Sequence, residues 1–192
     1  MRTRQSQATL RPPVIRPFHP LGTIRETMTP AESPKLPHPN IGIRLAAFLA
    51  DRREQIISEW TAAVHRDRKI SSSETLTHSQ LRDHLPQLLD NLSDTLCNAF
   101  NEDVKQQAAW TAATHGHMRW KEGYDVSELL CEMRDLRSAI IPHLIEFQEI
   151  HPDVGAARQL FSTITVHRFL DDAIRISVEQ FTVTSARTPR SD

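Results

Sequence analysis

The chain has 192 residues and a net charge of −1, so the molecule as a whole is not a binder of polyanions. This length accommodates one domain with a buried core, together with tails. No apolar run reaches the length of a membrane span, and the N-terminus lacks the apolar centre of a signal peptide. We therefore expect a cytoplasmic protein without membrane insertion, in which Cys97 and Cys131 are reduced core residues.

Residues 1–40 differ in composition from the rest of the chain. They hold eight of the twelve prolines, and six Arg or Lys against two Glu. Proline at this density prevents helices and sheet interiors, so we predict a disordered tail. An arginine-rich, acid-poor N-terminus is also typical of an organelle transit peptide, but these prolines disrupt the amphipathic helix that such a signal needs.

From residue 41 onward, apolar residues recur at helical spacing. The pattern predicts five long helices joined by short loops. They cover residues 41–66, 77–100, 103–120, 126–150 and 154–183. The C-terminal residues 185–192 are expected to fray. Strand signals are nearly absent. The sequence therefore predicts an all-α five-helix bundle over residues 41–184, after the disordered N-terminal tail.

Two prolines fall inside these predicted helices. Pro86 should bend the second helix or mark a broken first turn, and Pro142 should kink the fourth. The leading apolar positions include Phe100 at the end of the second helix, and Leu160 and Ile164 at the start of the fifth, all three expected on buried faces.

The stretch from His115 to Ile141 combines ionisable residues with an apolar helix pattern. His115 and Arg119 lie one helical turn apart and share a face. Gly116 lies inside that helix, where glycine is unfavourable, which indicates close approach of another backbone or a ligand. After a turn at Gly123, Asp125 and the residue three positions on form a capping box that begins the next helix.

Two charges interrupt the apolar stripe of that next helix. Glu132 lies on the face of Leu129, and Arg137 lies on the face of Met133. Because charges on an apolar face are costly to bury unless they are paired, we predict a partly buried network of four residues between the two helices. Its members are His115, Arg119, Glu132 and Arg137.

The familiar signatures of catalysis do not occur in the chain. It has no glycine-rich phosphate loop, no His-Glu-x-x-His zinc motif, no nucleophile elbow and no paired Glu-x-x-His elements. His115 and His117 diverge by about 200° on a helix and cannot chelate a metal together. Signs of charge are interspersed, so no basic face for nucleic acid is expected. We predict a protein that is not an enzyme.

The other histidines are expected to be structural. His65, His84 and His151 fall at solvent-facing positions, whereas His167 lies on an apolar face with Asp171 as its natural hydrogen-bond partner.

One ordered pattern resembles a known family. Its eleven positions are met in order by His115, Gly116, Arg119, Gly123, Tyr124, Asp125, Leu129, Glu132, Leu136, Arg137 and Ile140. The chain resembles the RsbRD-type N-terminal sensor domain, found in RsbT co-antagonist proteins and as an input domain of bacterial sensor histidine kinases. The likeness covers about residues 45–182, and it adds Tyr124 to the candidate site residues.

The resemblance implies a globin-related helical module, normally without haem and typically dimeric. Such a module receives a signal and passes it to a signalling partner or to an output domain at its C-terminal helix. No kinase or STAS output domain follows Phe181, so we expect no kinase activity and an action in trans, or a module separated from its output domain.

Three functions stay open from the sequence. The first is a non-catalytic sensory domain without a cofactor, and the second is a haem-binding gas sensor with His115 as axial ligand. The charged neighbours Arg119 and Glu132 count against haem. The third is an adaptor bundle in which the buried network only fixes the packing register.

Overall fold

The computed structural model describes residues 40–187, and within that range every regular element is a helix. Seven α-helices and one short 3₁₀ helix follow one another: α1 (Asn40–Asp51), α2 (Arg53–Arg66), η1 (Ser71–Thr75), α3 (His78–Arg82), α4 (Leu85–Cys97), α5 (Glu102–Lys121), α6 (Val126–Ile150) and α7 (Ala156–Arg187). The tail predicted for residues 1–40 lies outside the described residues, apart from Asn40. Of the end expected to fray, residues 185–187 are helical instead.

The all-α class is confirmed, but the count of five helices is wrong because two predicted helices are broken. The first break is at Arg52, whose backbone N–H donates to the Leu49 carbonyl, three residues back. The guanidinium of Arg52 lies 3.6 Å from the centre of the Phe48 ring and pairs with Glu146 of α6. The break lets α1 pack mainly on α4 while α2 packs mainly on α6.

The second break separates α3 from α4 at Asp83 and His84. Pro86 lies in the first turn of α4, where its missing N–H costs nothing, and its ring is incompatible with a helix that continues from Arg82. The broken first turn expected at Pro86 is therefore present. By contrast, α6 runs through Pro142 without ending.

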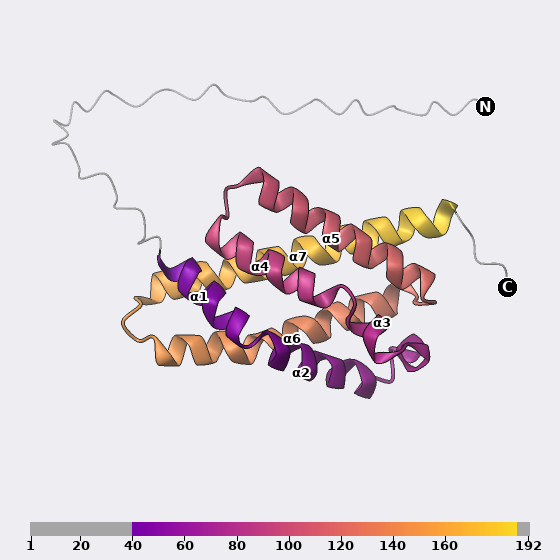
Figure 1. Ribbon diagram of the computed structural model, residues 1–192, viewed down its shortest axis with the longest axis horizontal. Helices are drawn as coiled ribbons and strands as arrows, with labels where there is room; N and C mark the ends of the chain where they lie inside the picture. The colour runs from indigo at the N-terminus through magenta and orange to yellow at the C-terminus, as the bar shows by residue number, and fades with distance from the viewer. Residues whose placement is uncertain (1–39, 188–192) are drawn as a thin grey trace, which may run out of the picture. The chain divides into compact units, whose positions relative to one another are not determined.

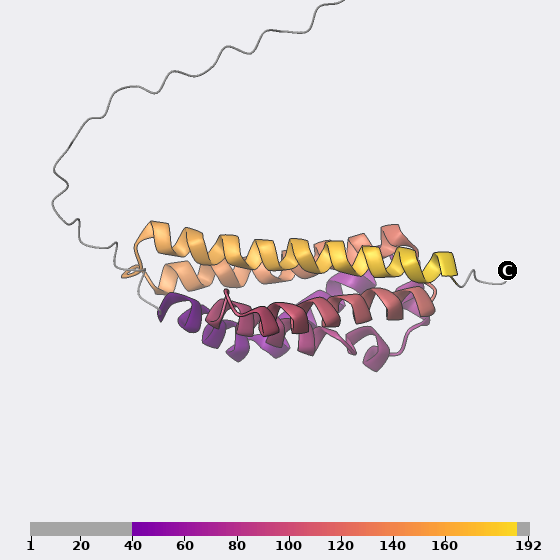
Figure 2. The same ribbon diagram turned by 90° about the horizontal axis from the view of Figure 1, so that it is seen from above.

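The long helix α7 organises the bundle. It runs alongside α5 and α6, as the two views in Figures 1 and 2 show, and it packs most extensively on α5. A single apolar core lies between the helices, and its largest fully buried members include Trp60, Tyr124 and Phe147.

Three residues expected on buried faces are exposed instead. Phe100 lies in the turn after α4, while Leu160 and Ile164 lie on α7. The buried stripe of α7 passes through Ser162 and Ser177, two small polar residues that an apolar pattern does not mark.

The two cysteines are free thiols, as predicted, but Cys97 is exposed rather than part of the core. No helix between residues 40 and 187 is both long and apolar enough to cross a membrane.

Candidate functional site

The loop between α5 and α6 brings the motif residues together. Gly123 has a φ of +96°, a conformation that favours glycine, and it reverses the chain after α5. Asp125 then caps α6: its side chain accepts from the Glu128 N–H, while the Glu128 side chain accepts from the Asp125 N–H. The same Glu128 carboxylate accepts from Ser71 and Ser72, which holds η1 against the start of α6.

A buried ion pair joins α5 to α6. The Arg119 Nε donates to both carboxylate oxygens of Glu132, at 3.0 and 2.8 Å, and Nη2 donates to Oε1 at 2.7 Å. Each of the two residues is only 1% exposed. Charge-assisted bonds of this geometry are among the stronger polar contacts in proteins, and burial makes the pairing obligatory.

Arg119 also reaches two further groups. Its Nη1 donates to the Glu122 carboxylate at 2.6 Å and its Nη2 donates to the Leu81 carbonyl at 2.6 Å, with a longer bond of 3.4 Å from Nη1 to the Gln80 carbonyl. Those carbonyls belong to the last turn of α3, where helical acceptors have no partner within the helix. One guanidinium therefore ties α3, α5 and α6 together.

Two aromatic residues enclose this ion pair. The Trp60 Nε1 donates to the backbone carbonyl of Glu132 at 3.2 Å, which attaches α2 to the same turn of α6. The Tyr124 ring lies with its centre 5.2 Å from the guanidinium carbon of Arg119. Burial, and secondarily the charge of Glu132, raises the pKa of the Tyr124 hydroxyl, so this residue is neutral across the physiological range.

Arg119 and Glu132 influence each other's ionisation. The carboxylates of Glu132 and Glu122 more than offset the burial of Arg119, so the pKa of its guanidinium is raised and it stays protonated. Burial raises the pKa of the Glu132 carboxyl, while the adjacent guanidinium opposes that rise.

His115 lies one turn before Arg119 and faces the same pair. Its Nε2 is 3.9 Å from Glu132 Oε1 and has no hydrogen-bond partner among residues 40–187. Burial lowers the pKa of His115 well below its usual value, and the charges of Arg119 and His84 lower it further. The imidazole is therefore neutral in the folded protein at physiological pH.

His84 is a neighbour of this site that the sequence did not indicate. It was expected to face solvent, but its ring meets the His115 ring edge to face at 6.5 Å, and its Nε2 is buried. No local pattern marks this contact, because only the packing of the α3–α4 corner against α5 creates it. Glu122, by contrast, could have been found from its position three residues after Arg119, at the C-cap of α5.

Arg137 is not part of the buried network, and that placement is corrected. It pairs with Asp171 of α7, and its side chain is partly exposed. Five residues of helix rotate its side chain by about 140° from Glu132, so the two occupy different faces. Asp171 accepts from Arg137, and within residues 40–187 no hydrogen bond joins it to His167, for which it was the expected partner.

The space beside His115 decides whether haem fits there. The cavity lined by His115, Arg119, Glu132, His84 and Trp60 has a volume of about 10 Å³. Cofactor sites typically occupy roughly 300–1,000 Å³. The side chains of the ion pair fill the place that a porphyrin would need, so these residues do not fit an axial haem site. Within the described part of the chain, no group of three His, Cys, Asp or Glu side chains is arranged to hold a metal ion.

Comparison with known proteins identifies the family. The model of the RsbT co-antagonist protein rsbRD N-terminal domain matches residues 54–192, which include every residue of the network. The chain belongs to this family. Searches of curated proteins and of solved structures gave no match, so the globin relation stays a prediction. Membership in the rsbRD N-terminal domain family assigns the chain to regulatory, stressosome-related domains.

Proposed function

We propose that this rsbRD-type domain is a non-catalytic input module of bacterial signal transduction, acting in the cytoplasm through a signalling partner or an output domain. The observation that carries the proposal is the Arg119 guanidinium, which binds the Glu132 carboxylate and the last carbonyls of α3 at once. Because this one side chain joins three helices, any change in its pairing acts on all three. A ligand or partner that favours one pairing would shift the helices.

The network is enclosed, so its state has to reach the surface through helices. The α5 helix that carries Arg119 packs along α7, and its Gly116 touches the α7 backbone at Ser177. A shift of α5 therefore displaces α7, whose C-terminal end is the natural place for an output domain or a partner.

A homodimer belongs to the same proposal. Several large aliphatic side chains of α6 and α7 are exposed, among them Ile141, Ile145 and Leu160. Association through them would remove apolar surface from water. Sedimentation of Ile145→Lys against the unchanged chain tests this: a dimer that becomes monomeric supports the interface, and a mass that does not change excludes it.

The regulatory proposal is tested in a chimera that carries this chain in place of the N-terminal domain of an RsbT co-antagonist protein. Glu132→Gln leaves Arg119 three acceptors, on Glu122, Leu81 and Gln80, so the fold should persist while the network is weakened. We expect Glu132→Gln to change signalling output.

The matched control is Glu146→Gln, on the same helix but bound to Arg52 outside the network. Output that is equal in the unchanged chimera, Glu132→Gln and Glu146→Gln, with Glu132→Gln strongly destabilised, would identify the pair as a structural register device only.

A further inference from the structure

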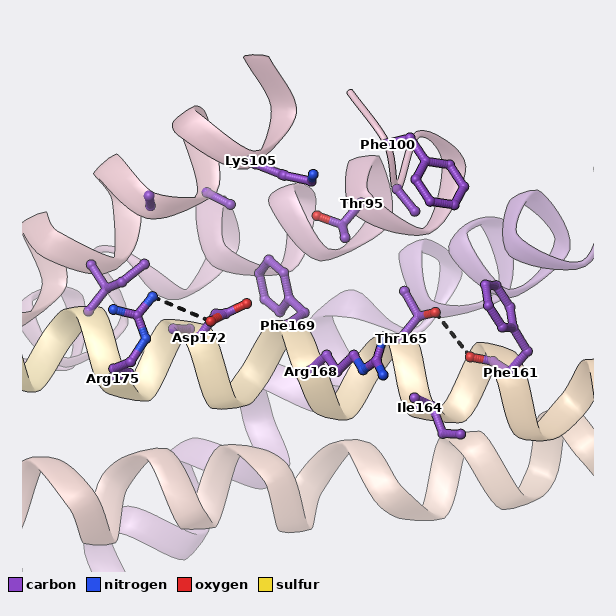
Figure 3. Close-up of a pocket in the computed structure, with 15 residues that line it drawn as sticks. Thr95, Phe100, Lys105, Phe161, Ile164, Thr165, Arg168, Phe169, Asp172 and Arg175 are labelled. Carbon is purple, nitrogen blue, oxygen red and sulfur yellow. Dashed lines mark hydrogen bonds and ion pairs between the residues drawn. The ribbon is translucent and has the colours of Figure 1, made fainter. Parts of the chain in front are cut away.

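A second cavity lies away from the buried network. It has a volume of about 650 Å³ and follows α7, with the end of α4 and the first half of α5 as its other wall (Figure 3). On the α7 side the lining includes Phe161, Phe169 and Ile176; on the opposite side it includes Phe100 and Ala108.

Close contact between α5 and α7 occurs at Gly116, near the C-terminal end of α5. A Cβ on Gly116 would lie 2.0 Å from the Ser177 carbonyl oxygen, so the helices touch there. Towards its N-terminus, α5 presents Ala108 and Ala109 to the cavity, and these short side chains leave the space along α7 unfilled. The result is a groove.

Large apolar side chains at one end of the groove are exposed. Phe100 is 86% exposed and Phe161 is 52% exposed. In Figure 3 these two rings stand at the same end of the groove, and Phe169 projects from α7 into it. Apolar surface gathered around a hollow in this way is typical of an interaction site.

The charges that line the groove are mainly positive, with three basic residues and one acidic residue. Arg168 has no ion-pair or hydrogen-bond partner in residues 40–187. Arg175 is shared between Glu179 and Asp172 in contacts that are open to solvent. Exposed pairs of this kind are weak and are readily exchanged for an incoming carboxylate.

We propose that this groove is the docking site for an amphipathic helix of a partner protein, with apolar anchors on one face and acidic residues beside them. From Phe161 to Ile176 the α7 wall extends for about 22 Å, the length of about four helical turns. Helices bind such grooves through side chains at i, i+3, i+4 and i+7.

The exposed aromatic rings favour a helix over an enclosed small ligand. A small molecule inside the cavity would leave the outer parts of the Phe100 and Phe161 rings in water, whereas a helix of this length covers both. The Arg168 guanidinium, which has no partner within residues 40–187, selects acidic flanks. The proposal does not depend on the buried network, since it uses none of its residues.

The test uses two designed 18-residue amphipathic peptides, with Leu at the anchor positions and either Glu or Lys on the flanks. Their binding to the full chain is measured by fluorescence anisotropy of a dye on the peptide. We expect the Glu peptide to bind at least tenfold more tightly than the Lys peptide. Arg168→Glu should weaken binding of the Glu peptide at least tenfold and should strengthen binding of the Lys peptide. The matched change Arg68→Glu, outside the groove, should alter the binding of neither peptide.

A second variant separates anchoring from charge. Phe161→Ser should weaken binding of the Glu peptide at least tenfold. The helix content and melting temperature of the protein should stay unchanged, because the ring is half exposed.

Three results would overturn the proposal. The first is that the Glu and Lys peptides bind equally, or that neither binds, both in the unchanged chain and in Arg168→Glu. The second is binding of dodecanoate that depends on Arg168 when neither peptide binds, which would reassign the groove to an anionic amphiphile. The third is self-association that Phe161→Ser abolishes without any peptide binding, which would make the groove an interface between copies of this chain.

Discussion

Arg119 is a buried cation whose positive charge is compensated by the groups around it. Two carboxylates and two backbone carbonyls accept its hydrogen bonds, and Tyr124 covers the guanidinium. Burying such a pair contributes little net stability compared with an apolar pair of the same size, but removing one partner leaves the other charge in a place with little solvation. The residue therefore determines the arrangement of its helices more than it adds to their stability.

Removal of this cation should be severe. We expect Arg119→Met to lower the free energy of unfolding by about 3–5 kcal/mol, because Glu132 is then buried without its partner. Urea denaturation followed by circular dichroism measures this loss. Arg175→Met, which removes an arginine from solvent-open pairs with Glu179 and Asp172, serves as the control and should change stability little. Equal effects of the two changes would show that the buried pair is not formed.

His115 should make stability depend on pH. Its pKa in the folded state lies well below 6.5, owing first to burial and then to the charges of Arg119 and His84. In the unfolded chain His115 binds a proton near pH 6.5, whereas in the folded chain it stays neutral at that pH. The free energy of unfolding should therefore fall as the pH drops below about 6.5. The limiting slope is about 1.4 kcal/mol per pH unit.

The matching variant is His115→Gln, which removes the titrating group. The difference in stability between the unchanged chain and this variant should itself depend on pH between about 6.5 and 4.5. A difference that is constant over that range would contradict a neutral, buried His115.

At the scale of the elements, the contact between α5 and α7 depends on one missing side chain. Gly116 lies against the Ser177 backbone, and the Ser177 hydroxyl donates to the Ala112 carbonyl at 2.8 Å. Both helices use small residues at this crossing, which explains why the buried stripe of α7 contains serines. The position of α7, and with it any signal it passes on, is set at this crossing.

A side chain at this crossing should force the two helices apart. We expect Gly116→Ser to lower the free energy of unfolding by about 1–3 kcal/mol, since the atom it meets belongs to backbone and cannot rotate away. Thermal denaturation measures the effect. Gly155→Ser is the matched control, because a Cβ there meets nothing within 4 Å and serine suits the start of a helix. Full tolerance of Gly116→Ser would contradict the close crossing.

At the scale of the whole molecule, local patterns predicted some features well. The bounds of α5 and α6 were close to those observed, because Gly123 and the Asp125 capping box mark their ends in the sequence. The break at Arg52 was missed because the apolar period continues across it, and only the separate partners of α1 and α2 require it.

The candidate site shows the same division between local and tertiary information. The pairing of Arg119 with Glu132 follows from two charges on facing apolar stripes. The approach of His84 and the departure of Arg137 to Asp171 depend on how whole helices pack, which spacing along one helix does not encode.

The most direct test of the account is hydrogen exchange on the full chain, comparing Glu132→Gln and Glu146→Gln with the unchanged protein. If the buried pair is a local switch that joins α3, α5 and α6, Glu132→Gln should speed amide exchange in residues 77–84 and 119–126 while α1 and α4 keep their protection, and Glu146→Gln should leave those segments unchanged. Equal acceleration in every helix, or no change in residues 77–84 and 119–126, would contradict it.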